Sequence, residues 1–157
     1  MSSGGPELLS DPLAKQLLAS TIPARFAYVW PDGSPRVVSL WFHWTGDDLV
    51  LATFGVAPKV RALRSGQPVA LTIDTEAPPN HVLSVRGRVD VREVRGVVPE
   101  YALAAERYLG HEAAAGYIGS LPADVPMTRI AVQPERVVLL DFETRFPTAL
   151  RALGLVP

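Results

Sequence analysis

Apolar and polar residues alternate along much of the chain, a pattern typical of half-buried β-strands. The clearest case is the segment 82–92, where one face is aliphatic and the other is polar and mostly basic. Gly87 lies on the aliphatic face, which indicates a bend or a close approach of another backbone. The aliphatic face consists of Leu83, Val85, Val89 and Val91, and the polar face of Ser84, Arg86, Arg88, Asp90 and Arg92.

Six further segments have strand-like patterns, and turn residues separate them. Asp32-Gly33 is a strong hairpin signal, and Gly46 marks the next turn. The first three strands are therefore predicted to form an antiparallel meander, and Pro134 separates the last two. The predicted strands cover residues 25–30, 36–44, 49–54, 69–74, 125–133 and 136–142.

Helices are predicted singly between these strands rather than in regular alternation with them. Asp11 is a suitable N-cap for a helix that Pro12 opens, and Pro58 opens another at about 58–65. This order argues against a doubly wound parallel sheet and favours a closed or nearly closed antiparallel barrel. Two more helices are predicted, over residues 99–109 and 112–119.

Domain organisation follows from the same pattern. Residues 1–157 are predicted to form a single domain, because neither an internal repeat nor a linker divides them. The segment 1–10 is predicted to be disordered. The segment 145–157 is interpreted as a C-terminal tail with a possible helical turn.

Composition narrows the function classes. The chain has 157 residues, 48% of them hydrophobic, and a formal net charge of −1, so neither a nucleic acid nor a membrane surface is the expected partner. It contains no cysteine, and its three histidines fall on separate elements, so no metal site is predicted. We see no signal peptide and no membrane-spanning apolar stretch, and a cytoplasmic location is the default expectation.

A possible anion site follows the third strand. Lys59 and Arg61 fall in the first turn of the helix that Pro58 opens, where unpaired backbone N–H groups favour negative charge. Cations at this end of a helix do not suit its dipole, but a phosphate held there would explain them. The alternative is that both are solvated surface charges, and this stretch does not decide between the two.

Trp41 is the most unusual of the aromatic residues. It shares a strand face with Ser39 and His43 rather than with the aliphatic residues of that strand, which indicates a subunit contact or a planar ligand. Asp141 and Glu143 flank Phe142 and form either a functional carboxylate pair or, more simply, a pair of rim charges.

Three segments, in their order along the chain, resemble the pyridoxamine 5′-phosphate oxidase-like flavin-binding split barrels. They are residues 36–39, residues 51–53 with Pro58-Lys59, and residues 85–89, and the resemblance covers roughly residues 20–145. It implies a mainly β protein with a few helices, built as a six-stranded antiparallel split β-barrel. It also implies a homodimer that binds FMN in a groove at the subunit interface.

By position, the resemblance assigns cofactor-binding roles to eight residues. Arg36 and Lys59 would hold the cofactor phosphate, with Arg61 a weaker candidate; Val37, Val38 and Ser39 would border the flavin ring; Thr53 and Phe54 would support the ring and its ribityl chain. The implied activity is a flavin-dependent oxidoreductase that transfers hydride to or from a small organic substrate. The cofactor performs the redox chemistry, so no catalytic acid or base is named.

Two alternatives remain open on the same fold. One is an F420-dependent reductase, in which the basic face of Arg86, Arg88 and Arg92 receives the acidic cofactor tail or is simply solvated. The other is a non-catalytic cofactor carrier or scaffold. Vitamin B6 oxidation is not favoured, because Arg145-Phe146-Pro147 matches the basic, substrate-binding C-terminal segment of pyridoxamine 5′-phosphate oxidase only weakly.

Overall fold

Eight strands form one antiparallel sheet in the computed structural model, which describes residues 2–156. The hydrogen-bonded order is β3-β2-β6-β7-β8-β5-β4, and β1 also pairs with β8. The strands are β1 (Ser2–Gly4), β2 (Ala24–Val29), β3 (Pro35–Leu40), β4 (Phe42–Trp44), β5 (Leu49–Phe54), β6 (Pro68–Asp74), β7 (Val82–Arg95) and β8 (Pro126–Leu140). The α-helices are α1 (Pro12–Leu18), α2 (Pro99–Leu109), α3 (His111–Gly119) and α4 (Thr148–Ala152), and two 3-10 helices are η1 (Pro6–Ser10) and η2 (Pro58–Arg61).

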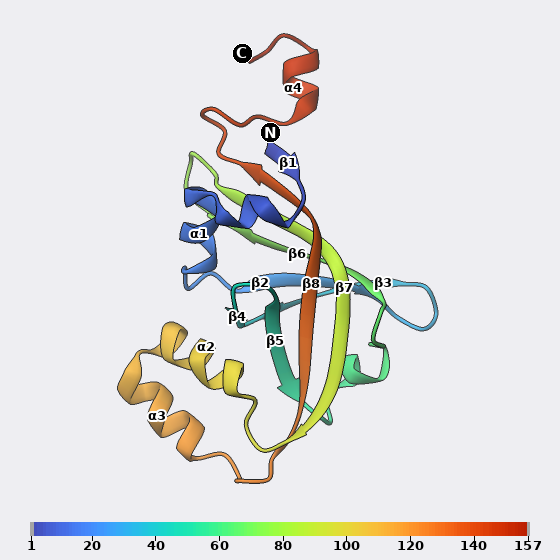
Figure 1. Ribbon diagram of the computed structural model, residues 1–157, viewed down its shortest axis with the longest axis vertical. Coiled ribbons are helices and arrows are strands. Elements are labelled where there is room, and N and C mark those ends of the chain that lie inside the picture. Colours follow the sequence, from blue (N-terminus) through green and yellow to red (C-terminus); the bar gives the residue numbers. More distant parts are fainter. Residues whose placement is uncertain (1, 157) are drawn as a thin grey trace.

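The sheet is curled but not closed. The long strands β7 and β8 lie side by side along most of the molecule, and β2 and β3 cross their middle (Figure 1). Among residues 2–156 no pairing joins the end strands β3 and β4. The mainly β antiparallel character is therefore confirmed, whereas the structure has eight strands in place of the six expected and leaves the sheet open.

The predicted strand over residues 36–44 is broken at Trp41. Its first part, β3, pairs with β2, and its second part, β4, pairs with β5. The predicted meander is therefore wrong at this point, because the chain changes partners in mid-strand. The alternation of side chains continues across the break: Val38 and Leu40 pack against the same core in which Phe42 is fully buried.

The two strands predicted at 125–133 and 136–142 are one strand, β8. A register shift between Arg86 and Gly87 on β7 lets β8 continue past Pro134, which cannot donate a ladder hydrogen bond. A Cβ atom built on Gly87 would lie 1.9 Å from the carbonyl oxygen of Gln133. The predicted close backbone approach at Gly87 is thus confirmed, and glycine is required there.

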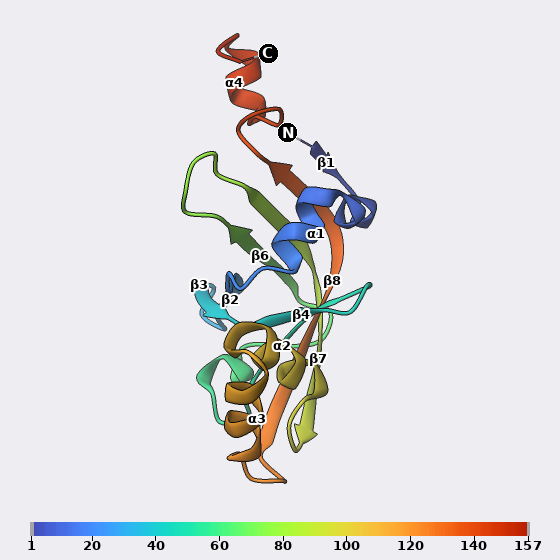
Figure 2. The same ribbon diagram turned by 90° about the vertical axis from the view of Figure 1, so that its left-hand side faces the viewer.

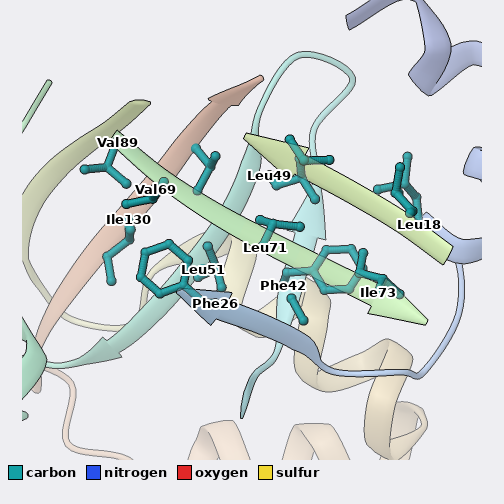
Figure 3. Close-up of a cluster of buried hydrophobic side chains, with 14 of the residues drawn as sticks. Leu18, Phe26, Phe42, Leu49, Leu51, Val69, Leu71, Ile73, Val89 and Ile130 are labelled. Carbon is teal, nitrogen blue, oxygen red and sulfur yellow. The ribbon is translucent and has the colours of Figure 1, made fainter. Parts of the chain in front are cut away.

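The concave side of the sheet encloses the main hydrophobic core (Figure 3). Helix α1 covers one end of this core with Leu17 and Leu18. The Asp11 carboxylate accepts a hydrogen bond of 2.9 Å from the Leu13 N–H, as expected of an N-cap. Side chains with no more than 1% exposure include Phe26, Phe42, Leu51, Leu71, Ile73 and Ile130.

The disorder predicted for residues 1–10 is wrong within the described residues; Met1 lies outside them. Strand β1 pairs with residues 137–139 of β8, and η1 follows with Leu9 buried in the core. The physical reason is that β1 satisfies backbone groups on β8 that would otherwise have no sheet partner.

Helices α2 and α3 pack together at one end of the molecule, where α2 contacts β4 and β5 (Figures 1 and 2). A second apolar cluster, which includes Ala52, Val98 and Met127, fills the space beneath α2. At the opposite end α4 extends away from the sheet, in the predicted tail. Among residues 2–156 no helix is both long and apolar enough to span a bilayer.

Candidate functional site

A groove opens between β3 and β5. The chain leaves β3, which pairs with β2, turns at Trp41 and continues into β4, which pairs with residues 49–51 of β5. The separation of β3 from β5 leaves a hollow of about 360 Å³ between them, closed on a third side by α2 and α3. Its lining residues are Ser39, Leu40, Trp41, Ala52, Thr53, Phe54, Tyr101 and Tyr117.

Lys59 reaches this groove through Thr53. Its Nζ donates a 3.0 Å hydrogen bond to Thr53 Oγ1, which lies near the end of β5. Pro58 opens the helix as predicted, but η2 is a four-residue 3-10 turn rather than a helix over 58–65. A single turn has little dipole, so the start of η2 does not by itself attract an anion. The anion site is indicated instead by the position of the Lys59 side chain.

The ammonium group of Lys59 is poorly compensated. The residue is partly buried, and burial lowers its pKa from the ordinary value of 10.5. The Thr53 hydroxyl is a neutral partner, and Lys59 takes part in no ion pair within residues 2–156. A phosphate at the same position would provide the missing charge and a stronger hydrogen bond, so the site fits an anion.

Thr53 lies directly opposite Thr128 on β8, where the inner face changes from apolar to polar. Thr128 is 1% exposed, and its hydroxyl has no hydrogen-bond partner in the part of the chain that the structure describes. Thr53 thus adds a polar group to the groove lining beside Lys59, whereas Thr128 lies outside that lining.

The other wall of the groove is aromatic. Trp41 stacks on Tyr108 at 5.2 Å with 9° between the ring planes, and Tyr101 and Tyr117 lie near its indole. The Tyr101 and Tyr117 hydroxyls hydrogen-bond to each other at 2.8 Å. Burial, and then the bond to Tyr117, raise the pKa of Tyr101, so its hydroxyl stays protonated and polar without being charged.

Sequence reasoning missed these tyrosines. Tyr101 and Tyr108 are seven residues apart on one face of α2, and Tyr117 follows on α3, so three of the four tyrosines in the chain fall within 17 residues. That clustering was the available signal. Trp41 itself was singled out from the sequence, and its ring is covered on one side by Tyr108 while it lines the groove.

Ion pairs and hydrogen bonds hold α2 against the sheet and thereby fix the aromatic wall. Arg129 on β8 donates to Glu100 Oε1 from both Nε, at 3.0 Å, and Nη2, at 2.7 Å. Arg107 donates from Nε to the carbonyl oxygen of Ser20 at 2.9 Å and from Nη2 to that of Phe42. Hydrogen bonding to Arg129 lowers the pKa of Glu100, so this pair remains charged at neutral pH.

The eight residues expected to bind the cofactor do not all converge. Ser39, Thr53 and Phe54 line the groove, and Lys59 joins them through Thr53. Val38 instead packs against the main core, because β3 turns that side chain inward.

The remaining three lie outside the groove lining. Arg36 and Arg61 are exposed, and the Arg36 guanidinium lies 5.4 Å from the ring centre of Trp30. Val37 is 66% exposed on the outer face of β3. The groove of one chain therefore does not form a phosphate-binding site that contains both Arg36 and Lys59.

The carboxylates near Phe142 have a structural explanation. Asp141 accepts hydrogen bonds from the backbone N–H groups of Glu143, Thr144 and Arg145 and from the Thr144 hydroxyl. Desolvation raises the pKa of Asp141, but these bonds outweigh it and hold the pKa well below its usual range. Asp141 thus organises a turn. No metal-binding group of histidine, aspartate or glutamate side chains occurs in residues 2–156.

Comparison with models of known protein families gives no match, and neither does comparison with curated proteins. Solved structures do match. A structure described as an F420 reductase is 28% identical, with a TM-score of 0.60 over 81% of this chain and 95% of its own. A FAD- and heme-binding protein from Mycobacterium smegmatis is 17% identical, with a TM-score of 0.59 over 98% and 80% of the two chains.

HutZ, the heme storage protein from Vibrio cholerae, is also 17% identical, with a TM-score of 0.57 over 82% of this chain and 94% of its own. These neighbours are split-barrel proteins, and their names refer to F420, FAD and heme. The resemblance noted from the sequence is therefore confirmed as a resemblance of fold: the chain has the antiparallel sheet of the cofactor-binding split barrels.

Proposed function

We propose that the protein is an oxidoreductase that binds a phosphate-bearing flavin or deazaflavin in the groove between β3 and β5. The observation that carries this proposal is the half-buried ammonium of Lys59, held at the groove by Thr53 without a carboxylate partner. A flavin-type cofactor, when bound, supplies the hydride chemistry. The substrate is a small organic molecule that occupies the rest of the groove.

The chain's own residues bind and orient the cofactor and shield it from water. Lys59 contributes a charge-assisted hydrogen bond to a phosphate, and Thr53 keeps the lysine side chain directed toward the groove. Phe54 and Trp41 offer flat apolar surface for a ring system, and Ser39 offers a hydroxyl at the rim. Because the floor of the groove is apolar, a bound ring would exclude water from it.

The Lys59 site does not decide between FMN and F420, and other observations bear on that choice. The Lys59 site suits the phosphate of either cofactor. The similarity to the structure described as an F420 reductase, which has the highest identity of those reported above, supports F420 as the second candidate. Of the three arginines on the basic face of β7, Arg88 and Arg92 are already paired with Glu135 and Asp90. Arg86 lies opposite Arg136 on β8, and an acidic cofactor tail bound there would reduce the repulsion between the two like charges.

We further propose a homodimer in which a second subunit completes the groove. Val37 and Val29 share the outer face of the β2–β3 hairpin and are 66% and 47% exposed. Arg36, the second phosphate ligand implied by the resemblance, lies on the same hairpin and outside the groove lining. A partner subunit packed on this face would bury the valines, whereas Arg36 belongs to the opposite face of β3.

The test is to identify the cofactor on the purified protein. We expect flavin or deazaflavin absorbance, and mass spectrometry of the material released by denaturation should give FMN or F420. If the protein is purified empty, titration with each cofactor separates the two candidates. A protein that binds neither cofactor would refute the proposal, and a heme spectrum would assign the groove to a different chemistry.

A non-catalytic carrier predicts a different outcome. It would bind the cofactor with the same dependence on Lys59, but the bound cofactor would exchange electrons with organic substrates no faster than the free cofactor does. Steady-state and single-turnover reduction assays on the loaded protein distinguish this case from an enzyme.

A further inference from the structure

A second pocket lies outside the groove, between α1, β4 and α2. It has a volume of about 250 Å³ and shares no lining residue with the groove. Its lining residues are Lys15, Leu18, Ala19, His43, Trp44 and Arg107. None of the residues assigned to the proposed cofactor site contributes to it.

The charge of this pocket is one-sided. Lys15 and Arg107 are cationic, and no acidic residue is among the lining. Burial, and then the charge of Arg107, lower the pKa of His43, so its imidazole adds no charge at neutral pH. The nearby Glu100 is already engaged by Arg129 at 2.7 Å. Within residues 2–156, neither Lys15 nor Arg107 takes part in an ion pair.

Hydrogen bonds hold the Arg107 side chain in place but do not neutralise its charge. Two of its five N–H groups donate to the backbone carbonyls of Ser20 and Phe42, which carry no net charge. Its guanidinium lies 4.7 Å from the ring centre of Phe42 and 4.9 Å from that of Tyr108. These contacts fix the plane of the guanidinium and leave N–H donors available for a planar anion.

The rest of the pocket is apolar. Leu18 and Ala19 come from the C-terminal end of α1, and Trp44 comes from β4. An inorganic anion would use the cations but would leave these walls unused. A flat organic body against Trp44, with a carboxylate directed at the cations, would use both.

We propose that this pocket binds a small organic carboxylate with an apolar or aromatic body. The carboxylate contacts Arg107 and Lys15, and the body packs against Trp44 and Leu18. The site does not depend on the proposed oxidoreductase function, so either can fail without the other.

The experiment is an NMR titration of the full-length protein with benzoate, followed through the Trp44 indole N–H and the amide signals of residues 15–19. Benzamide, which has the same shape without the charge, and acetate, which has the charge without the ring, are the comparison probes. We expect saturable shifts with benzoate and at least roughly tenfold weaker binding of both comparison probes.

Substitution of the two lysines of the chain completes the test. Lys15→Gln should weaken benzoate binding about tenfold at these signals, whereas Lys59→Gln, which removes the other lysine, should leave it unchanged. Lys15 is exposed on α1, so its replacement should not unfold the protein. Equal binding of benzamide and benzoate, an unchanged affinity in Lys15→Gln, or the absence of saturable shifts would each overturn the proposal.

Discussion

At the scale of single residues, the environment of Lys59 is the feature that most needs a functional explanation. A lysine on a short turn could extend into solvent at little cost, but Lys59 is partly buried against a neutral hydroxyl. Burial of an ammonium without a counter-charge is unfavourable. The cost is offset if an anion occupies the site when the protein works.

This environment predicts a pH dependence for cofactor binding. Burial lowers the pKa of Lys59 in the free protein, and a bound phosphate would raise it again. Binding therefore takes up a proton in the interval between these two pKa values. Affinity should be constant below the pKa of the free protein and should fall as the pH rises through it, by up to about tenfold per pH unit.

The measurement is the dissociation constant of FMN from about pH 7.5 upward, where a phosphate monoester has already lost its second proton near pH 6. Lys59→Arg is the matched variant, because an arginine stays charged throughout this range. We expect a flatter profile for the variant. An identical slope in both proteins would mean that Lys59 does not hold the anion.

At the scale of elements, the contact between β7 and β8 depends on Gly87. Gly87→Ala should lower the free energy of unfolding by about 2 kcal/mol or more, because the new Cβ would collide with the backbone of Gln133. Gly116→Ala on α3 is the control: nothing lies within 4 Å of its Cβ position, and alanine favours the helix by up to about 1 kcal/mol. Urea denaturation of both variants should give opposite signs.

Asp11 joins α1 to the C-terminal segment and has two separable roles. It caps α1 through the Leu13 N–H, and it pairs with Arg145 at 2.8 Å. Asp11→Asn keeps a capping oxygen and loses the charge, so it should cost under about 1 kcal/mol. Asp11→Ala loses both roles and should cost about 1 kcal/mol more in thermal or urea unfolding. Equal losses in the two variants would show that the cap contributes nothing.

Elements with local signals could be predicted from the sequence, and those that depend on distant partners could not. The Asp11 cap, the Asp32-Gly33 turn, the α2 bounds and the alternation around Gly87 were all read correctly. The break at Trp41 was missed because the alternation of side chains continues through it. Strand β8 was predicted as two strands divided at Pro134, because the bulge beside this proline, at Glu135 opposite Arg86 and Gly87, depends on the pairing of β8 with β7.

The residues of the candidate site likewise fall into those that local sequence could predict and those that depend on tertiary packing. Thr53 and Lys59 are six residues apart, so their contact follows from a short turn, and both were named from the sequence. Tyr101 and Tyr117 enter the groove through the packing of α2 on the sheet and α3 on α2, which no local pattern encodes. Val38 was included by its place in the chain, and the pleat of β3 turns it into the core.

At the scale of the whole molecule, the open groove and the exposed hairpin predict self-association. Val37→Lys should shift the protein from dimer to monomer, because it places a charge in the proposed apolar interface. Leu155→Lys in the tail is the control, since Leu155 is 67% exposed at the opposite end of the chain. Sedimentation velocity at several concentrations measures both. A wild-type protein that stays monomeric at all of them would contradict the proposed dimer.

In the proposed function Lys59 holds the phosphate of a flavin-type cofactor, and NMR of that side chain tests this role. The chain has two lysines, so ¹³C-methylation gives a spectrum with one signal each for Lys15 and Lys59 besides the amino terminus. On titration with FMN or F420, the Lys59 signal should shift and saturate at the stoichiometry of binding. A cofactor that binds with the Lys59 signal unmoved, or a Lys59 signal that responds to neither cofactor, would show that Lys59 does not hold the cofactor phosphate.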